Sequence, residues 1–261
     1  MRLTWYGTAC LTVETGGTLL AFDPFLKFPN PGQEPPEARA LRAAALGRCR
    51  RVFVTHGHID HLHSAREIYL DTPAEFYLTA SPARHLLRQG FPAERLHIVE
   101  PGQSVALADA RVAVYRARHI HFDWPLIRSR VCAETLRQPG KTAYLLASFA
   151  TWPEAGEIVA YCVEAEGKRL LIFGSAGLDA GECYPVGVDA LVLPHQGRSN
   201  ITEVCTDITR RIAPKQVFLD HYDNAYPPLT RLVDCGAYCD RVRALCRAEP
   251  LAEGEPVEIN L

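Results

Sequence analysis

The sequence predicts an α/β protein in which two β-sheets pack together and helices lie on the outside. Segments rich in β-forming residues occur in both halves of the chain, and segments typical of helices alternate with them. No short-period repeat, low-complexity tract or clear linker interrupts this pattern. We therefore expect one domain over residues 1–261.

The N-terminal half begins with a β-meander. Glycines and short β-forming runs predict strands at 3–7, 10–14 and 18–22, ending at Asp23-Pro24. A loop rich in proline and glycine follows over residues 25–36. The same criteria predict the next elements in chain order: a helix at 37–46, a strand at 51–54, a helix at 60–70, a strand at 75–78, a helix at 82–88, and strands at 97–99, 104–107 and 112–115.

The C-terminal half repeats the strand–loop–helix order. Residues 122–156 contain several prolines, and we expect them to form an irregular flap over one end of the molecule. The remaining predicted elements are a β-hairpin of 158–163 and 169–173 around Gly167, strands at 190–193 and 216–219, and helices at 202–212 and 229–247. Leu232, Val233, Gly236, Val242 and Cys246 would share one face of the last helix.

Composition limits the classes of partner. The formal net charge is -2 with a charged fraction of 22%, so nothing attracts the whole chain to nucleic acid or to an anionic membrane. We expect a small-molecule substrate, no nucleic acid and no membrane, and we leave a homo-oligomer open. The sequence shows no signal peptide, and its nine cysteines form no C-x-x-C pair. These features predict a cytoplasmic protein with reduced thiols.

The segment 55–61 carries the chemistry. Three imidazoles and a carboxylate, from His56, His58, Asp60 and His61, follow directly after a buried strand. His56 and His58 can point the same way on an extended loop and bind one ion, while Asp60 and His61 can face a second. Imidazole and carboxylate together suit zinc, manganese or iron better than calcium or magnesium. A chance cluster of surface polar residues would not be expected at the end of a buried strand.

This H-x-H-x-D-H pattern resembles that of the metallo-β-lactamase superfamily. Trp5-Tyr6-Gly7 and the segment 20–24 resemble its cytoplasmic branch, which includes ascorbate-6-phosphate lactonase. The resemblance implies an αββα sandwich of two mixed sheets flanked by helices, with the metals at one edge of the sheets. It also implies a divalent transition metal as cofactor, one or two ions, with zinc favoured over manganese or iron.

The resemblance also implies a role for individual residues. His56 and His58 match ligands of the first metal, and Asp60 and His61 match ligands of the second. Three further positions complete the comparison: Asp23 as an acid that supports the metal loop from behind, His119 as the third ligand of the first metal with His121 as its competitor, and His221 as a ligand of the second metal.

The sequence departs from the family pattern after Gly174. The family places a metal-bridging aspartate there, whereas this chain has Ser175. Without that carboxylate two dications repel each other with less compensation. We therefore expect one tightly bound ion and a weaker or absent second, unless Asp179 replaces the missing acid.

The predicted function is hydrolysis of a small ester, lactone or phosphodiester by a metal-activated water. Asp60 is the expected acid–base group, and His195 is the favoured proton donor, with Tyr222 and His121 as alternatives. Arg198, near a helix N-terminus, could hold a phosphate. The alternatives are a nuclease, or a metal-binding or regulatory protein of this fold with little or no turnover. A di-iron oxygen-reducing protein is disfavoured because its branch has glutamate at the position of His58.

Overall fold

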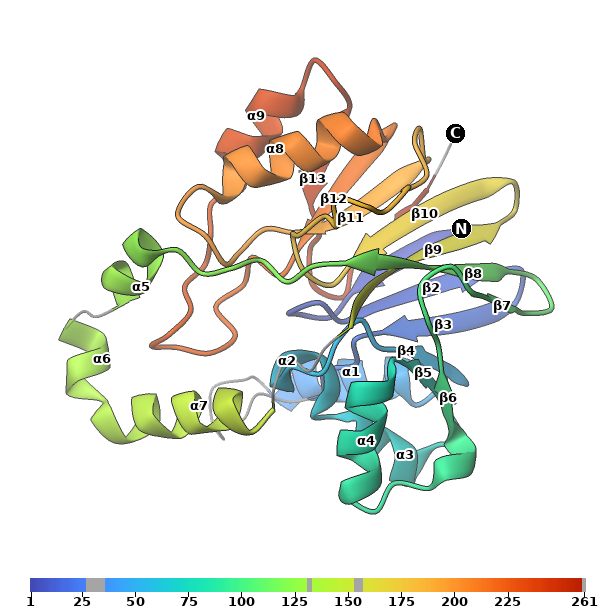
Figure 1. Cartoon of the computed structure of the whole chain (residues 1–261), viewed down its shortest axis with the longest axis horizontal. Helices are drawn as coiled ribbons and strands as arrows, with labels where there is room; N and C mark the ends of the chain where they lie inside the picture. The colour runs from blue at the N-terminus through green and yellow to red at the C-terminus, as the bar shows by residue number, and fades with distance from the viewer. Residues whose placement is uncertain (27–35, 131–132, 153–156, 260–261) are drawn as a thin grey trace.

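The computed structural model describes residues 1–26, 36–130, 133–152 and 157–259. Within these residues the chain forms two seven-stranded mixed sheets (Figure 1). Sheet A has the order β14 (Pro256–Glu258), β1 (Arg2–Trp5), β2 (Leu11–Thr15), β3 (Thr18–Phe22), β4 (Arg51–Phe53), β5 (Glu75–Leu78), β6 (Leu96–Ile98). Sheet B has the order β13 (Arg247–Pro250), β12 (Gln216–Asp220), β11 (Ala190–Pro194), β10 (Lys168–Phe173), β9 (Ile158–Ala165), β8 (Arg111–Ala117), β7 (Ser104–Ala106).

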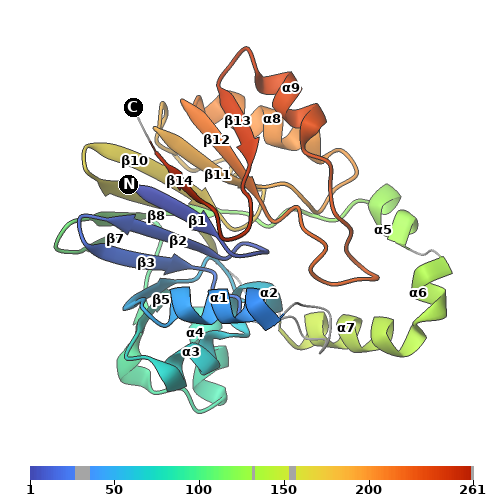
Figure 2. The same cartoon turned by 180° about the vertical axis from the view of Figure 1, so that it is seen from behind.

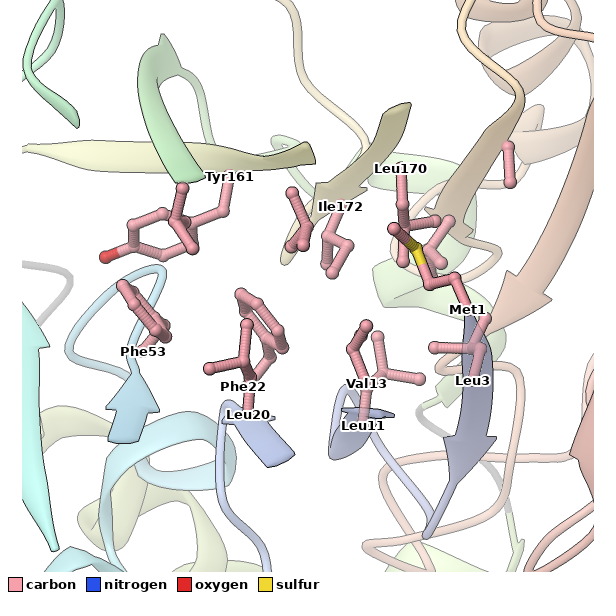
Figure 3. Packing of buried hydrophobic residues seen from close by; sticks show 14 of the residues in the cluster. Met1, Leu3, Leu11, Val13, Leu20, Phe22, Phe53, Tyr161, Leu170 and Ile172 are labelled. Atoms are coloured by element: carbon pink, nitrogen blue, oxygen red, sulfur yellow. The ribbon is translucent and has the colours of Figure 1, made fainter. Parts of the chain in front are cut away.

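The two sheets meet across an apolar core built from alternate residues of their strands. Figure 3 shows Phe22 and Phe53 of sheet A facing Tyr161 of sheet B. The Phe53 and Tyr161 rings lie 5.3 Å apart between centroids in an edge-to-face arrangement. The Tyr161 hydroxyl donates a hydrogen bond of 2.9 Å to the carbonyl of Val54, which directly follows β4. This bond ties sheet B to the start of the histidine-rich loop.

Helices cover the outer face of each sheet, which confirms the expected αββα sandwich (Figures 1 and 2). On sheet A, buried side chains of α1 (Pro36–Leu46), α3 (Ala65–Asp71) and α4 (Ala80–Arg88) form one apolar cluster with the strands. On sheet B, α8 (Ile201–Ile212) and α9 (Gly236–Val242) do the same. None of the helices described is long and apolar enough to cross a membrane.

Most of the expected elements of the first half are confirmed, including the meander of β1, β2 and β3. The predicted helix at 60–70 is divided into α2 (Ile59–Leu62) and α3. At the break, the Ser64 hydroxyl accepts a 2.9 Å hydrogen bond from the backbone N–H of Leu26, which fixes the local chain direction. A 3₁₀ turn at Ala93–Arg95 precedes β6.

The prediction of an irregular flap was wrong, because this stretch contains three helices. They are α5 (Trp124–Arg130), α6 (Ala133–Arg137) and α7 (Pro139–Thr151), and they form an arc at one side of the molecule (Figure 1). Pro125 and Pro139 lie in first helical turns, where the missing N–H breaks no helix hydrogen bond. Asp123 Oδ1 accepts the N–H of Leu126 at 3.0 Å and caps α5. Residues 131–132 and 153–156, like most of the expected loop at 25–36, lie outside the described residues.

The predicted helix at 229–247 was also largely wrong. Only α9 is helical there, and its start is fixed by Asp234 Oδ1, which accepts the N–H of Gly236 at 2.9 Å. Leu232, expected on the buried face, is 69% exposed. The chain then forms β13, which pairs in parallel with β12, and later β14, which pairs with β1. Residues 229–235, in the part of the prediction that failed, have no regular secondary structure, and the Val233 N–H donates to the carbonyl of Tyr222 at 2.8 Å instead of to a helical partner.

Candidate metal centre

The potential metal ligands come from loops at the ends of strands in both sheets. Residues 56–61 follow β4 of sheet A, and α2 begins within them. His119 follows β8 of sheet B, and His221 follows β12. The strands of the two sheets thus deliver side chains from three distant parts of the sequence to one end of the sandwich.

His56, His58 and His119 form the first ligand group, with donor atoms all within 4.8 Å of one another. His56 Nε2 lies 3.2 Å from His58 Nδ1. In His56 and His119, the hydrogen bond made by one ring nitrogen determines that the other nitrogen faces the group. Thr55 donates its hydroxyl proton to Asp23, so its oxygen accepts from His56 Nδ1 at 3.0 Å. His119 donates from Nδ1 to the carbonyl of Ile120 at 2.6 Å. Both rings therefore turn Nε2 toward the group.

The first group is chemically suited to a cation. Burial, reinforced by neighbouring imidazoles, lowers the pKa of His56 well below its ordinary value. Burial also lowers the pKa of His119 to about 4. At neutral pH these rings are uncharged and present lone pairs, which is the form that binds zinc. Converging lone pairs within this distance fit a shared transition-metal ion.

Asp60, His61 and His221 form the second ligand group, again with donor atoms within 4.8 Å. His221 Nε2 donates to Asp60 Oδ2 at 3.0 Å, and His61 Nε2 lies 3.8 Å from the same oxygen. Asp60 Oδ1 is buried and has no hydrogen-bond partner among the described residues. Burial alone would raise the pKa of Asp60, but His61 and His221 lower it well below its ordinary value. The group thus offers an ionised carboxylate and two imidazoles.

Asp23 supports both groups from behind. Its Oδ1 accepts the N–H of Thr55 and its Oδ2 accepts the Thr55 hydroxyl, both at 2.7 Å. Asp23 Oδ2 also lies 2.8 Å from His61 Nδ1, which leaves His61 Nε2 for an ion. Gly174 must approach closely here, because a Cβ at that position would lie 1.9 Å from Thr55 Oγ1. Asp23 therefore stands where the resemblance placed it, behind the ligands.

Ser175 and Asp179 lie near the site, but neither belongs to a ligand group among the described residues. Ser175 lines the same cavity as the second group, and its hydroxyl accepts the N–H of Ile120 at 3.0 Å. Asp179 instead accepts hydrogen bonds from Arg118 Nε and the Gly181 N–H, both at 2.9 Å. The structure does not bring Asp179 to the position of the missing bridging acid.

The expected proton donors are not brought to the metal centre. His195 is fully buried and packs against Tyr238, with ring centroids 5.3 Å apart, and it does not line the cavity. The Tyr222 hydroxyl donates to the carbonyl of Leu251 at 2.7 Å. His121 is exposed and belongs to neither ligand group among the described residues, so His119 rather than His121 joins His56 and His58.

The position expected to hold a phosphate is filled by the protein itself. Near the N-terminus of α8, the N–H of Ser199 donates to both carboxylate oxygens of Asp123 at 3.2 Å, and the Ser199 hydroxyl also donates to Asp123. Arg198 Nε lies 3.9 Å from the same carboxylate. An internal anion thus neutralises this turn, and the expectation of a phosphate site there was wrong.

A cavity of about 770 Å³ opens beside the ligand groups and was not foreseen from the sequence. His58, Asp60, His61, His119 and His221 line it together with side chains from 122–146 and 226–230. The apolar residues within 122–146 could have indicated this cavity, but the prolines of the segment led us to predict an irregular flap. Thr55 was also missed, although its position between a buried strand and His56 marks it as a residue that orients the histidine.

An αββα sandwich with two ligand groups at one end of its sheets defines a class of metal-binding proteins. Residues 19–222 match the family described as "Beta-lactamase superfamily domain", and the chain therefore belongs to the metallo-β-lactamase superfamily.

Relatives and solved structures agree with this assignment. A "UPF0173 metal-dependent hydrolase" of Anaeromyxobacter dehalogenans is 32% identical over 125 residues, 45% of this chain and 42% of the relative. The chain spans about half the length of the curated relatives it matches. Igni18, a metallo hydrolase from Ignicoccus hospitalis, shares the fold with a TM-score of 0.65 at 20% identity, covering 98% of this chain and 97% of that one. CmlA, a diiron β-hydroxylase from Streptomyces venezuelae, gives 0.64 at 13% identity, covering 98% and 53%.

Proposed function

We propose that this protein is a metal-dependent hydrolase of a small ester, lactone or phosphodiester, with zinc as its metal. The observation that carries the proposal is the pair of ligand groups, His56–His58–His119 and Asp60–His61–His221, which share one cavity. The similarity to the Anaeromyxobacter metal-dependent hydrolase supports it. The eight cysteines of the described residues are free, which supports a cytoplasmic location.

A bound divalent transition metal would supply hydroxide at neutral pH, by lowering the pKa of water toward ~7, and would stabilise negative charge on the substrate oxygen. The neutral rings of His56 and His119 would hold the first ion without competing protons. Asp60 remains ionised, and its Oδ1 is the atom free to orient the attacking water or to accept its proton. Asp23 keeps His61 in the orientation and tautomer this arrangement needs.

The two ligand groups differ in the charge they supply. The first is made of imidazoles only, and the second contains one carboxylate, Asp60. Ser175 adds a neutral hydroxyl where a bridging carboxylate would compensate two dications. We therefore propose that the protein binds one ion tightly and a second more weakly.

Metal content and turnover test this function together. Protein purified without chelators or a histidine tag would be assayed by elemental mass spectrometry, then tested with zinc or manganese on phosphodiesters, thioesters, esters and lactones. We expect at least one ion per chain and metal-dependent hydrolysis that His58→Ala abolishes. The control His97→Ala, at a half-buried histidine outside both ligand groups, should retain it. Hydrolysis of DNA or RNA alone would instead assign a nuclease.

A metal-binding or regulatory role without turnover is the second candidate, and Ser175 is the observation that favours it. This role predicts stoichiometric metal without hydrolysis of any substrate in the panel. Metal-dependent turnover that depends on His58 would exclude it.

A further inference from the structure

The cavity beside the metal centre is largely apolar. Besides the metal ligands, its lining includes Phe122, Leu126, Ile127, Leu136, Pro139, Ala143, Leu146 and Leu229. Arg130 is the single permanently charged cation among the lining residues that the structure describes. Its volume of about 770 Å³ falls within the range of roughly 300–1,000 Å³ typical of small-molecule sites.

The helices α5, α6 and α7 present their apolar side chains to this cavity instead of burying them in the core. Phe122 is 62% exposed, Leu136 72% and Leu146 56%. The neighbouring Leu145 is fully buried in the apolar cluster on the outer face of sheet A. One face of α7 is therefore packed against the core, and another faces the cavity. Large apolar side chains gathered around one hollow mark a binding surface.

The helix N-terminus that the sequence suggested as a phosphate site is not offered to this cavity, which leaves Arg130 as the one permanently charged cation among its described lining residues. The N-terminal turn of α8 donates to Asp123, and Arg198 lies beside the same carboxylate. The ligand groups, which could stabilise a developing oxyanion, therefore lie next to the apolar part of the cavity. This combination suits an uncharged ester with a long apolar chain.

We propose that the substrate is an ester or lactone of a medium- or long-chain aliphatic acid, with its chain in the apolar part of the cavity. The inference rests on the proposed hydrolase function and names its substrate class. Water adds to the acyl carbon, its oxygen forming the new C–O bond while the ester C–O bond breaks. One water proton goes to the leaving alkoxide, giving the alcohol, and the acid product loses the other to become a carboxylate.

The occupant is a substrate rather than a second copy of the chain, because the apolar lining is continuous with the ligands. His58, His61 and His221 line the same cavity as Leu136 and Leu146. A chain that lies along the helices therefore directs its polar end toward the metal groups.

Acyl-chain selectivity tests this proposal. Zinc-loaded protein would be assayed on p-nitrophenyl esters from acetyl to octanoyl. We expect kcat/KM to rise on the order of 10- to 100-fold from butanoyl to octanoyl, because the added methylene groups leave water. Leu136→Asn should remove most of this preference. The control Leu70→Asn changes another exposed leucine, which is 61% exposed on α3 and does not line the cavity, and it should retain the preference.

Binding to metal-free protein gives a readout without turnover. Calorimetry should detect dodecanoate but not butanoate, with a negative heat-capacity change that Leu136→Asn reduces. Ester hydrolysis without chain-length preference, or with a preference unchanged in Leu136→Asn, would overturn the substrate class and leave the hydrolase function standing. Binding of dodecanoate without hydrolysis of any ester would overturn the hydrolase function while supporting an aliphatic ligand. A dimer that Leu136→Asn dissociates, with no dodecanoate binding, would assign the surface to a second copy and overturn the proposal.

Discussion

Asp60 and His221 form a 3.0 Å hydrogen bond that joins the first turn of α2 to the end of β12 across 161 positions of sequence. Burial alone would lower the pKa of His221, but the hydrogen bond and negative charge of Asp60 raise it to about 9. At neutral pH the metal-free protein therefore holds a proton in the second ligand group, whereas the ring of His119 in the first group is neutral.

Metal binding to the second group should therefore release a proton from His221. Because His221 is protonated below about pH 9, the affinity of this group should rise by up to about tenfold per pH unit between pH 7 and 9 and then level off. His56 and His119 of the first group should release almost no proton at pH 7, because their rings are already neutral. Zinc titration calorimetry in two buffers of different ionisation enthalpy measures this difference. Identical heats in both buffers for the weaker ion would contradict the prediction.

Replacing Ser175 by aspartate should strengthen the second ion. Ser175→Asp adds a carboxylate beside both groups, and we expect at least tenfold tighter binding of the weaker ion, because one more negative charge offsets the repulsion between the dications. Ser175→Asn is the matched control, since it has a similar shape without the charge. Equal zinc affinities for the two variants would show that the missing charge does not limit the site.

Asp23→Asn should weaken metal binding without removing a ligand. The change takes away the negative charge that lies 2.8 Å from His61 Nδ1 and disturbs its tautomer. We expect zinc affinity to fall by about 10–100-fold, the typical effect of losing such a supporting carboxylate. Competition with a chromogenic chelator measures it, and the exposed Asp109→Asn serves as control. An unchanged affinity would mean that Asp23 only stabilises the loop.

His195 should make the fold sensitive to acid. Burial lowers its pKa to about 4, so the unfolded chain takes up this proton first as pH falls below about 6.5. The folded state loses stability until pH about 4, by up to about 3 kcal/mol. Urea unfolding of metal-free protein at pH 7 and pH 4.5 should show a smaller loss for His195→Leu than for the parent. The half-buried His97→Gln should behave like the parent, and an equal loss for His195→Leu would refute this account.

Much of the fold could be predicted because its strands carry local signals. The runs around Gly16-Gly17 and Gly167 alternate β-forming residues with turn glycines, and the structure has hairpins there. The flap was predicted because of its prolines, but Pro125 and Pro139 stand in first helical turns, where a helix tolerates them. No local pattern predicted β13, which forms where β12 offers a parallel edge.

The clustering of the potential ligands could be predicted from the sequence, but the surroundings of the cluster could not. His56, His58, Asp60 and His61 lie within six positions, so their spacing alone predicts that they meet. The role of Asp23 depended on a family resemblance, because its contact with His61 joins two separate strand ends. His195 follows a buried strand as a site residue would, yet its ring turns to the opposite face of sheet B, toward Tyr238.

The arc of α5, α6 and α7 connects β8 to β9, two strands that already pair with each other along their whole length. A tight hairpin would satisfy that pairing, so the 40 residues between them are an insertion that the sandwich does not need for closure. Of those that the structure describes, His119, at the start of the connection, alone belongs to a ligand group. Exchange of the remaining residues for a segment of different length or polarity would reshape the cavity and leave the histidine cluster intact. Changes in this connection would therefore alter which small molecules the cavity admits without altering the ligand groups.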